Sequence, residues 1–265
     1  MLPDLSMFND FALFALVGLV AQFIDGALGM AYGITAASFL LAAGVPPAHT
    51  SASVHIAKFF TTAASGAAHA SYKNVDRRLF LTLAFAGAVG GAVGALVVTS
   101  IDPAIIKPFI IAYLALMGVV ILWRVLRTTP QVNLPSKGVA PLGLVGGFLD
   151  AIGGGGWGPI VTTSLIGRGG EPRLIIGSVN AAEFFVTLAI GSALIATIVT
   201  GHWKDAGAIV NNAAAIAGLI VGGLISAPIA GRFVSRVPRP VLGVAVGLLV
   251  LALAAYQAAA MMRWL

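Results

Sequence analysis

The sequence predicts an all-α polytopic membrane protein built from two related halves. Hydrophobic residues make up 59% of the 265 residues and charged residues only 9%, whereas a soluble domain carries about 25% charge. Apolar runs of about 20 residues, the length that spans a bilayer as a helix, recur along the whole chain. The alternation of apolar and polar residues that marks a membrane-spanning β-strand is absent from these runs.

The N-terminal segment, the cysteine content and the net charge restrict the possible kinds of protein further. No Lys or Arg precedes the first apolar run, so this run is expected to stay as a helix and not to be removed as a secretory signal. The chain has no cysteine, which excludes disulfides, thiolate metal sites and Cys nucleophiles. The net charge of +6 comes from basic residues in short loops, which indicates topology signals and not nucleic-acid binding.

An internal repeat divides the chain at a constant offset of 125 residues. The segment "GLVAQFIDGALGMAYG" (18–33) matches "GLVGGFLDAIGGGGWG" (143–158), and "SVHIAKFF" (53–60) matches "SVNAAEFF" (178–185). The repeat predicts a first half at 1–126, a cytoplasmic linker at 127–138 and a second half at 139–265.

Each half contains the same series of elements. An apolar hairpin broken at glycines comes first, followed by a helix with polar residues and then by two plainer helices. The expected ranges are 8–44, 51–70, 79–100 and 104–126, then 139–167, 175–199, 206–232 and 240–262. The second arm of the later hairpin has only about 11 apolar residues, too few to cross about 30 Å, so a re-entrant or half-length helix is expected there. For the first hairpin, a re-entrant loop and two full spans both remain open.

Loop charge predicts the orientation. With the N-terminus outside, most basic loop residues fall inside, as the positive-inside rule requires. The inside set is Lys73, Arg77, Arg78, Arg124, Arg127, Lys137, Arg168, Arg173, Arg232, Arg236 and Arg239, and the outside set is Lys107, Lys204 and Arg263. The second half of the chain then enters the membrane from the opposite side. Such inverted repeats are typical of secondary transporters.

A polar stripe runs along the helix expected at 51–70. Ser51, His55, Lys58, Thr62, Ser65 and His69 are spaced by 4, 3, 4, 3 and 4 residues, which places them on one helical face. A charged side chain at membrane depth costs free energy. Such side chains therefore face a partner residue or a polar cavity. Two interpretations follow: Lys58 forms an ion pair with its repeat counterpart Glu183, or His55 and Lys58 face a polar cavity and attract an anion.

The two hairpin breaks are the second candidate feature. Broken helices present partially positive backbone amides to anionic groups, and glycine permits both the turn and a close approach. Asp25 and Asp150 stand at these breaks, where they either cap the local amides or change protonation during transport. Tyr32 and Trp157 either line the substrate site or pack.

These segments resemble the TauE/SafE sulfite exporter family, also called the toluene sulfonate uptake permease family. The resemblance rests on "GLVAQFIDGALGMAYG" with "SASVHIAKFFTTAASGAAH", and on "GFLDAIGGGGWGP" with "GSVNAAEFFVT". It implies an inner-membrane carrier of about eight spans in two inverted repeats. It also implies substrates such as sulfite, sulfonates, sulfoacetate or other small organosulfur anions, moved with protons.

The predicted function is secondary active transport of a small sulfur-containing anion by alternating access, with an anion channel of the same architecture as the alternative. No enzymatic activity, cofactor or metal is expected, because the motifs of serine hydrolases, metalloproteases and nucleotide-binding loops are missing. The partners are the lipid bilayer, the anion and protons, and the assembly is a monomer or a homodimer. The predicted substrate-binding residues are Gly26, Gly29, Tyr32, Ser53, His55, Lys58, Gly153, Gly154, Gly155, Gly156, Trp157, Ser178 and Asn180; those predicted for proton coupling are Asp25, Asp150 and Glu183.

Overall fold

The computed structural model describes residues 5–28, 30–125, 138–204, 206–233 and 239–262, and no strand occurs within them. The first half contains α1 (Leu5–Leu28), α2 (Tyr32–Ala42), α3 (Pro47–Ser71), α4 (Arg77–Ser100) and α5 (Pro103–Val125). The second contains α6 (Val139–Gly153), the π-helical turn η1 (Gly158–Thr162), α7 (Thr163–Gly167), α8 (Pro172–Val199), the 3-10 segment η2 (Ala206–Asn212), α9 (Ala213–Phe233) and α10 (Arg239–Met262). The predicted all-helical class and the series of elements are therefore confirmed.

Local sequence explains where the helices begin and end. The Asp76 carboxylate accepts a hydrogen bond from the Leu79 amide and caps α4. Prolines occupy the first position of α3 and α8, where a missing amide hydrogen costs nothing. Gly154 follows α6 in a left-handed conformation with φ +69°, which ends the helix at the glycine run.

Helix length and composition make this a multi-pass membrane protein. Among the described residues, five helical stretches are long and apolar enough to cross a bilayer: Arg77–Ser100, Pro103–Val125, Pro172–Val199, Ile209–Ala227 and Gly243–Met262. Tyr32–Ala42, Val139–Gly153 and Gly158–Gly167 are apolar but shorter. The hairpin arms α2, α6 and η1–α7 are thus too short to be assigned as spans, and the expected total of about eight stays a prediction.

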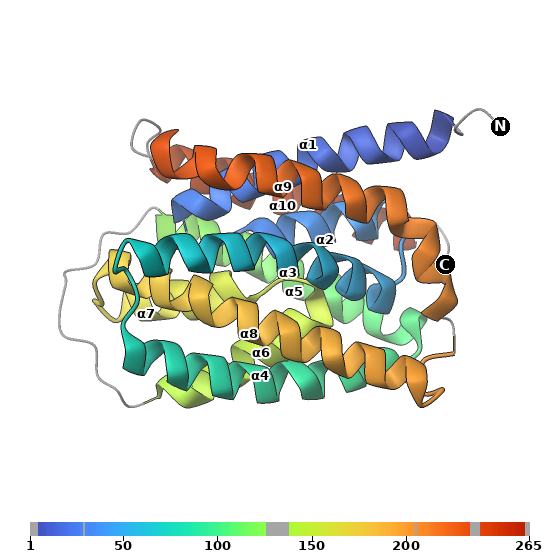
Figure 1. Ribbon diagram of the computed structural model, residues 1–265. Helices are drawn as coiled ribbons and strands as arrows, with labels where there is room; N and C mark the ends of the chain where they lie inside the picture. The colour runs from blue at the N-terminus through green and yellow to red at the C-terminus, as the bar shows by residue number, and fades with distance from the viewer. Residues whose placement is uncertain (1–4, 29, 126–137, 205, 234–238, 263–265) are drawn as a thin grey trace.

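The helices lie roughly side by side in one elongated bundle, with α1, α9 and α10 along one side and α4, α6 and α8 along the other (Figure 1). The most extensive packing joins α1 to α9, α4 to α6 and α8, α5 to α10, and α3 to α8. Glycines allow the closest of these approaches. A Cβ at Gly90 would collide with the Leu144 carbonyl of α6, and one at Gly222 with the Ala15 carbonyl of α1, so both positions need glycine for this packing.

The loops gather at the two ends of the bundle. At one end the Arg173 guanidinium donates to the Asn74 side chain at 2.5 Å and to the Tyr72 carbonyl at 3.2 Å, which joins the start of α8 to the α3–α4 loop. At the other end Ser100 lies 2.6 Å from His202. The basic loops around residues 73–78 and 168–173 therefore share one end, as expected. Arg127, Lys137, Arg236 and Arg263 lie outside the described residues.

Candidate functional site

The two helix breaks meet at a backbone contact. A Cβ at Gly155 would collide with the backbone of Gly33 and Ile34, so only glycine fits between the two chain segments. Residues 33 and 155 belong to different halves of the chain. The breaks at 25–33 and 150–158 therefore come together at this point.

An aspartate satisfies backbone amides at each break. Asp25 accepts a hydrogen bond from the Tyr32 amide at 3.2 Å. Asp150 accepts from the Gly156 amide at 2.9 Å and from the Trp157 amide at 3.1 Å through the same oxygen, Oδ1. The capping interpretation of both carboxylates therefore describes their contacts in this structure.

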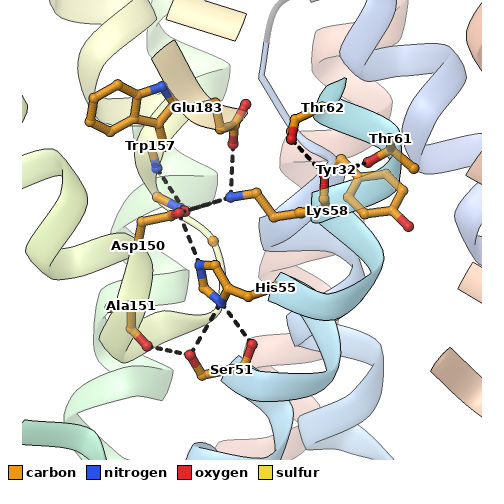
Figure 2. A network of polar contacts seen from close by, with 12 residues as sticks. Tyr32, Ser51, His55, Lys58, Thr61, Thr62, Asp150, Ala151, Trp157 and Glu183 are labelled. Carbon is orange, nitrogen blue, oxygen red and sulfur yellow. Dashed lines mark hydrogen bonds and ion pairs between the residues drawn. The ribbon is translucent and has the colours of Figure 1, made fainter. Parts of the chain in front are cut away.

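The polar stripe of α3 brings a lysine to the second break. The Lys58 ammonium donates to both oxygens of Asp150, at 3.0 and 2.8 Å, and lies 2.7 Å from Oε1 of Glu183. The lysine is 1% exposed and Asp150 is fully buried. The expected pair of Lys58 with Glu183 is present, but Lys58 also bridges to Asp150, so the two carboxylates share one ammonium (Figure 2).

His55 contacts Asp150 from the other side. We call His55, Lys58, Asp150 and Glu183 together the cluster. The His55 Nδ1 lies 2.7 Å from the Ser51 carbonyl oxygen, and its Nε2 lies 3.1 Å from Asp150 Oδ2. A carbonyl oxygen only accepts, so Nδ1 carries a hydrogen. A proton must also lie between Nε2 and the carboxylate, because neither atom otherwise has a hydrogen to donate. His55 and Asp150 therefore share a proton in this arrangement.

A small polar cavity adjoins the cluster. It has a volume of about 10 Å³, room for about one water molecule. Its lining is Gln22, Asp25, Tyr32, Lys58, Thr61, Thr62, Ser65, Asn180 and Glu183. Asn180 donates to Ser65 and lies 3.4 Å from His69 Nε2, whereas its buried Oδ1 has no hydrogen-bond partner among the described residues.

An apolar groove between α3 and α8 reaches the cluster at His55. It encloses about 300 Å³ and extends from His55 and Thr187 at mid-helix to Ile198 and Trp203 near the end of α8. The buried Thr187 hydroxyl has no partner within the described part of the chain. A Cβ at Gly191, on the same groove, would meet open space.

Several predicted site residues lie elsewhere or serve packing. The Ser178 hydroxyl of α8 accepts from the Asp76 amide at 2.8 Å and so contacts the α3–α4 loop, not the ionisable groups around Asp150. The Trp157 indole is fully buried and donates to the Val179 carbonyl at 3.0 Å, and the Tyr32 hydroxyl donates to the Leu219 carbonyl at 2.9 Å. Both side chains are thus held by buried hydrogen bonds, although Tyr32 also borders the small cavity.

The remaining predicted positions are the glycines and Ser53. Gly153 and Gly156 pack against Tyr113, and Gly154 forms the left-handed turn. Ser53 is buried, and its hydroxyl has no partner in the described residues. Gly26 lies near the end of α1, and Gly29 lies outside the described residues.

Two contacts of the site are not evident from the sequence. Tyr113 of α5 donates to the Gly155 carbonyl at 3.2 Å and braces the second break. No pattern around it distinguishes it from other aromatic residues of an apolar helix. Ser51 belongs to the predicted stripe, but its hydrogen bond to the Ala151 carbonyl, at 2.5 Å, links α3 to α6 in a way that helical spacing does not reveal.

The fold and the site define a class of protein. Buried ionisable groups between two broken helices, inside a bundle of apolar helices, are characteristic of membrane transporters. Within the described residues no group of three His, Asp or Glu side chains is arranged to hold a metal ion.

Comparison with known proteins agrees with this class. The family model for the sulfite exporter TauE/SafE matches residues 14–257, and the chain belongs to this family. It is 40% identical over 241 residues to a probable membrane transporter protein, YtnM, from Bacillus subtilis (strain 168), with 88% of this chain and 78% of that protein covered. No solved structure matches. The family and this relative indicate a membrane transporter and not an enzyme.

Proposed function

We propose that this protein is a secondary active transporter that moves a small sulfur-containing anion, such as sulfite or a sulfonate, across the bacterial inner membrane with protons. The observation that supports this most directly is the set of hydrogen-bond donors around Asp150. Lys58, His55 and the amides of Gly156 and Trp157 all converge on one carboxylate. A site that holds a carboxylate in this way has the donors that a small oxyanion needs.

The contacts between helices support an inverted repeat in the architecture that carries this site. At the offset of 125 residues α6 corresponds to α1, and by element order α9 corresponds to α4. The contact of α1 with α9 is therefore matched by the contact of α6 with α4, as a pseudo-twofold arrangement requires. We assign the halves to 1–126 and 139–265, with the end that carries the basic loops facing the cytoplasm and the N-terminus outside.

The groove between α3 and α8 provides the access route in this proposal. It begins near Trp203, at the end of the bundle opposite the basic loops, and ends at His55. In alternating access, closing this groove and opening a path past Ser65 and His69 would expose the site to the other side.

A carrier fits the structure better than a channel. The backbone contact between Gly33 and Gly155 closes the space between the two breaks. A channel needs a continuous pore, whereas a carrier passes through closed states in each cycle.

The test is uptake into proteoliposomes of sulfite, sulfoacetate, isethionate and taurine, with and without an inward proton gradient. We expect saturable uptake of at least one anion that the gradient stimulates, and loss of that uptake in Lys58→Ala and in His55→Ala. Unchanged uptake in both variants would remove the proposed site. Flux that grows with concentration without saturating, and that carries current, would instead support the channel.

A further inference from the structure

In this structure the proposed anion site already holds an anion that belongs to the protein. Asp150 Oδ1 accepts from two backbone amides and from Lys58, and Oδ2 contacts Lys58 and His55 at 2.8 and 3.1 Å. Asp150 is fully buried, so water does not compete for these donors. Each donor that a substrate oxyanion would use is engaged with this carboxylate.

The charges around Asp150 do not allow a second anion to be added beside it. The titratable groups that face it are His55 and Lys58 of α3, Glu183 of α8, Asp25 of α1 and Tyr113 of α5. With a proton on His55 and with all three carboxylates ionised, these groups carry two positive and three negative charges including Asp150 itself. Another buried negative charge would add repulsion, because Lys58 and His55 are already engaged with Asp150 and Glu183.

We propose that Asp150 and the substrate anion compete for the same donors, and that Asp150 takes up one proton when the substrate replaces it. This inference rests on the proposed function and specifies its coupling step. The proton comes from solvent and binds to the released carboxylate, while His55 and Lys58 keep their protons and donate to the substrate. Asp150 thus acts as an internal substitute for the substrate, and proton and anion move together.

Thermodynamic linkage predicts the direction and the size of the pH dependence of anion affinity. If one proton is bound for each anion, the anion affinity falls about tenfold for each pH unit of increase, in the range where Asp150 is ionised before binding and protonated after it. Binding of the anion and binding of the proton then strengthen each other by the same factor.

Isethionate is a suitable probe because a sulfonate stays ionised across the working pH range, so a proton taken up on binding must go to the protein. Calorimetric titration of the detergent-purified protein, in two buffers with different ionisation enthalpies, counts the protons. We expect uptake of about one proton per bound isethionate in the wild type. Sulfoacetate serves as a second probe in the same assay.

The variant Asp150→Asn keeps an oxygen that accepts from the two amides but cannot ionise. We expect it to bind isethionate with no proton uptake and with an affinity that no longer changes with pH. The matched control is Asp10→Asn at an exposed position of α1, which we expect to retain proton uptake because Asp10 lies about four helical turns before the first break.

The outcomes separate the two proposals. Anion binding by the wild type without proton uptake, or continued uptake in Asp150→Asn, would overturn the competition and leave anion transport standing. Failure of the wild type to bind either probe or to transport any of the four anions would overturn the proposed function itself.

Discussion

Lys58 and Asp150, 92 positions apart in the chain, form a fully buried ion pair in which the ammonium donates to both carboxylate oxygens. The lysine comes from the polar helix of the first half and the aspartate from the broken helix of the second. Glu183 approaches the same ammonium from α8. The pair therefore fixes three helices, α3, α6 and α8, around one point, and its loss should affect both stability and transport.

Removal of the ammonium should strongly destabilise the protein. In Lys58→Ala, two buried carboxylates lose their shared cation, a change that costs about 3–5 kcal/mol at buried pairs. Thermal unfolding in detergent should show a clear decrease in the midpoint temperature. Glu183→Gln is the control, because it leaves the Lys58–Asp150 pair intact and should be milder. Equal stability of both variants and the wild type would contradict the role of the cluster.

The contact between the two breaks should not tolerate a methyl group. Gly155→Ala places a Cβ into the backbone of Gly33 and Ile34, and such overpacking costs about 1–3 kcal/mol. We expect a lower unfolding midpoint and slower transport. Gly191→Ala is the matched control, since its Cβ meets open space on a helix and alanine is the better helix former. A wild-type unfolding midpoint in Gly155→Ala would contradict the observed backbone contact.

The groove should be essential if substrate enters through it. Gly191→Leu fills the groove in front of His55 without a backbone collision, so we expect transport to fall at least tenfold while the unfolding midpoint stays near that of the wild type. Ala196→Leu adds the same side chain at an exposed position of α8 outside the groove. Equal transport rates in the two variants would exclude this access route.

The indole of Trp157 should act through packing. Trp157→Phe removes the hydrogen bond to the Val179 carbonyl and some buried volume, so stability should decrease by about 1–3 kcal/mol. The concentration of substrate that half-saturates transport should stay unchanged. A large change in that concentration with wild-type stability would instead place the ring against the substrate.

The orientation can be tested directly because the chain has no cysteine. Arg78→Cys and Lys204→Cys introduce single thiols at exposed positions on opposite ends of the bundle. A membrane-impermeant maleimide added to intact cells should label the cysteine at position 204 and not the one at 78. The reverse pattern would invert the proposed topology, and labelling of both would contradict a single orientation.

Most of the architecture could be predicted from one sequence because membrane helices have strong local signals. The expected helix at 79–100 occurs as Arg77–Ser100, and the one at 51–70 as Pro47–Ser71. The internal repeat also predicts that Asp25 and Asp150 stand at equivalent breaks, and each accepts backbone amides there. Spacing alone put His55 and Lys58 on one helical face, where the structure has them.

The sequence by itself determined the membrane class, the order of the helices and the residue types available for a polar site, because these depend on hydropathy, helical period and repetition along the chain. Only the tertiary structure decided which side chains of the site contact one another. It placed Lys58 between Asp150 and Glu183, turned Ser178 toward Asp76, joined Trp157 to the Val179 carbonyl, and brought Tyr113 to the glycine run. Those contacts join residues up to 125 positions apart. They depend on how far each helix rotates and how closely glycine lets its neighbour approach, which no local pattern encodes.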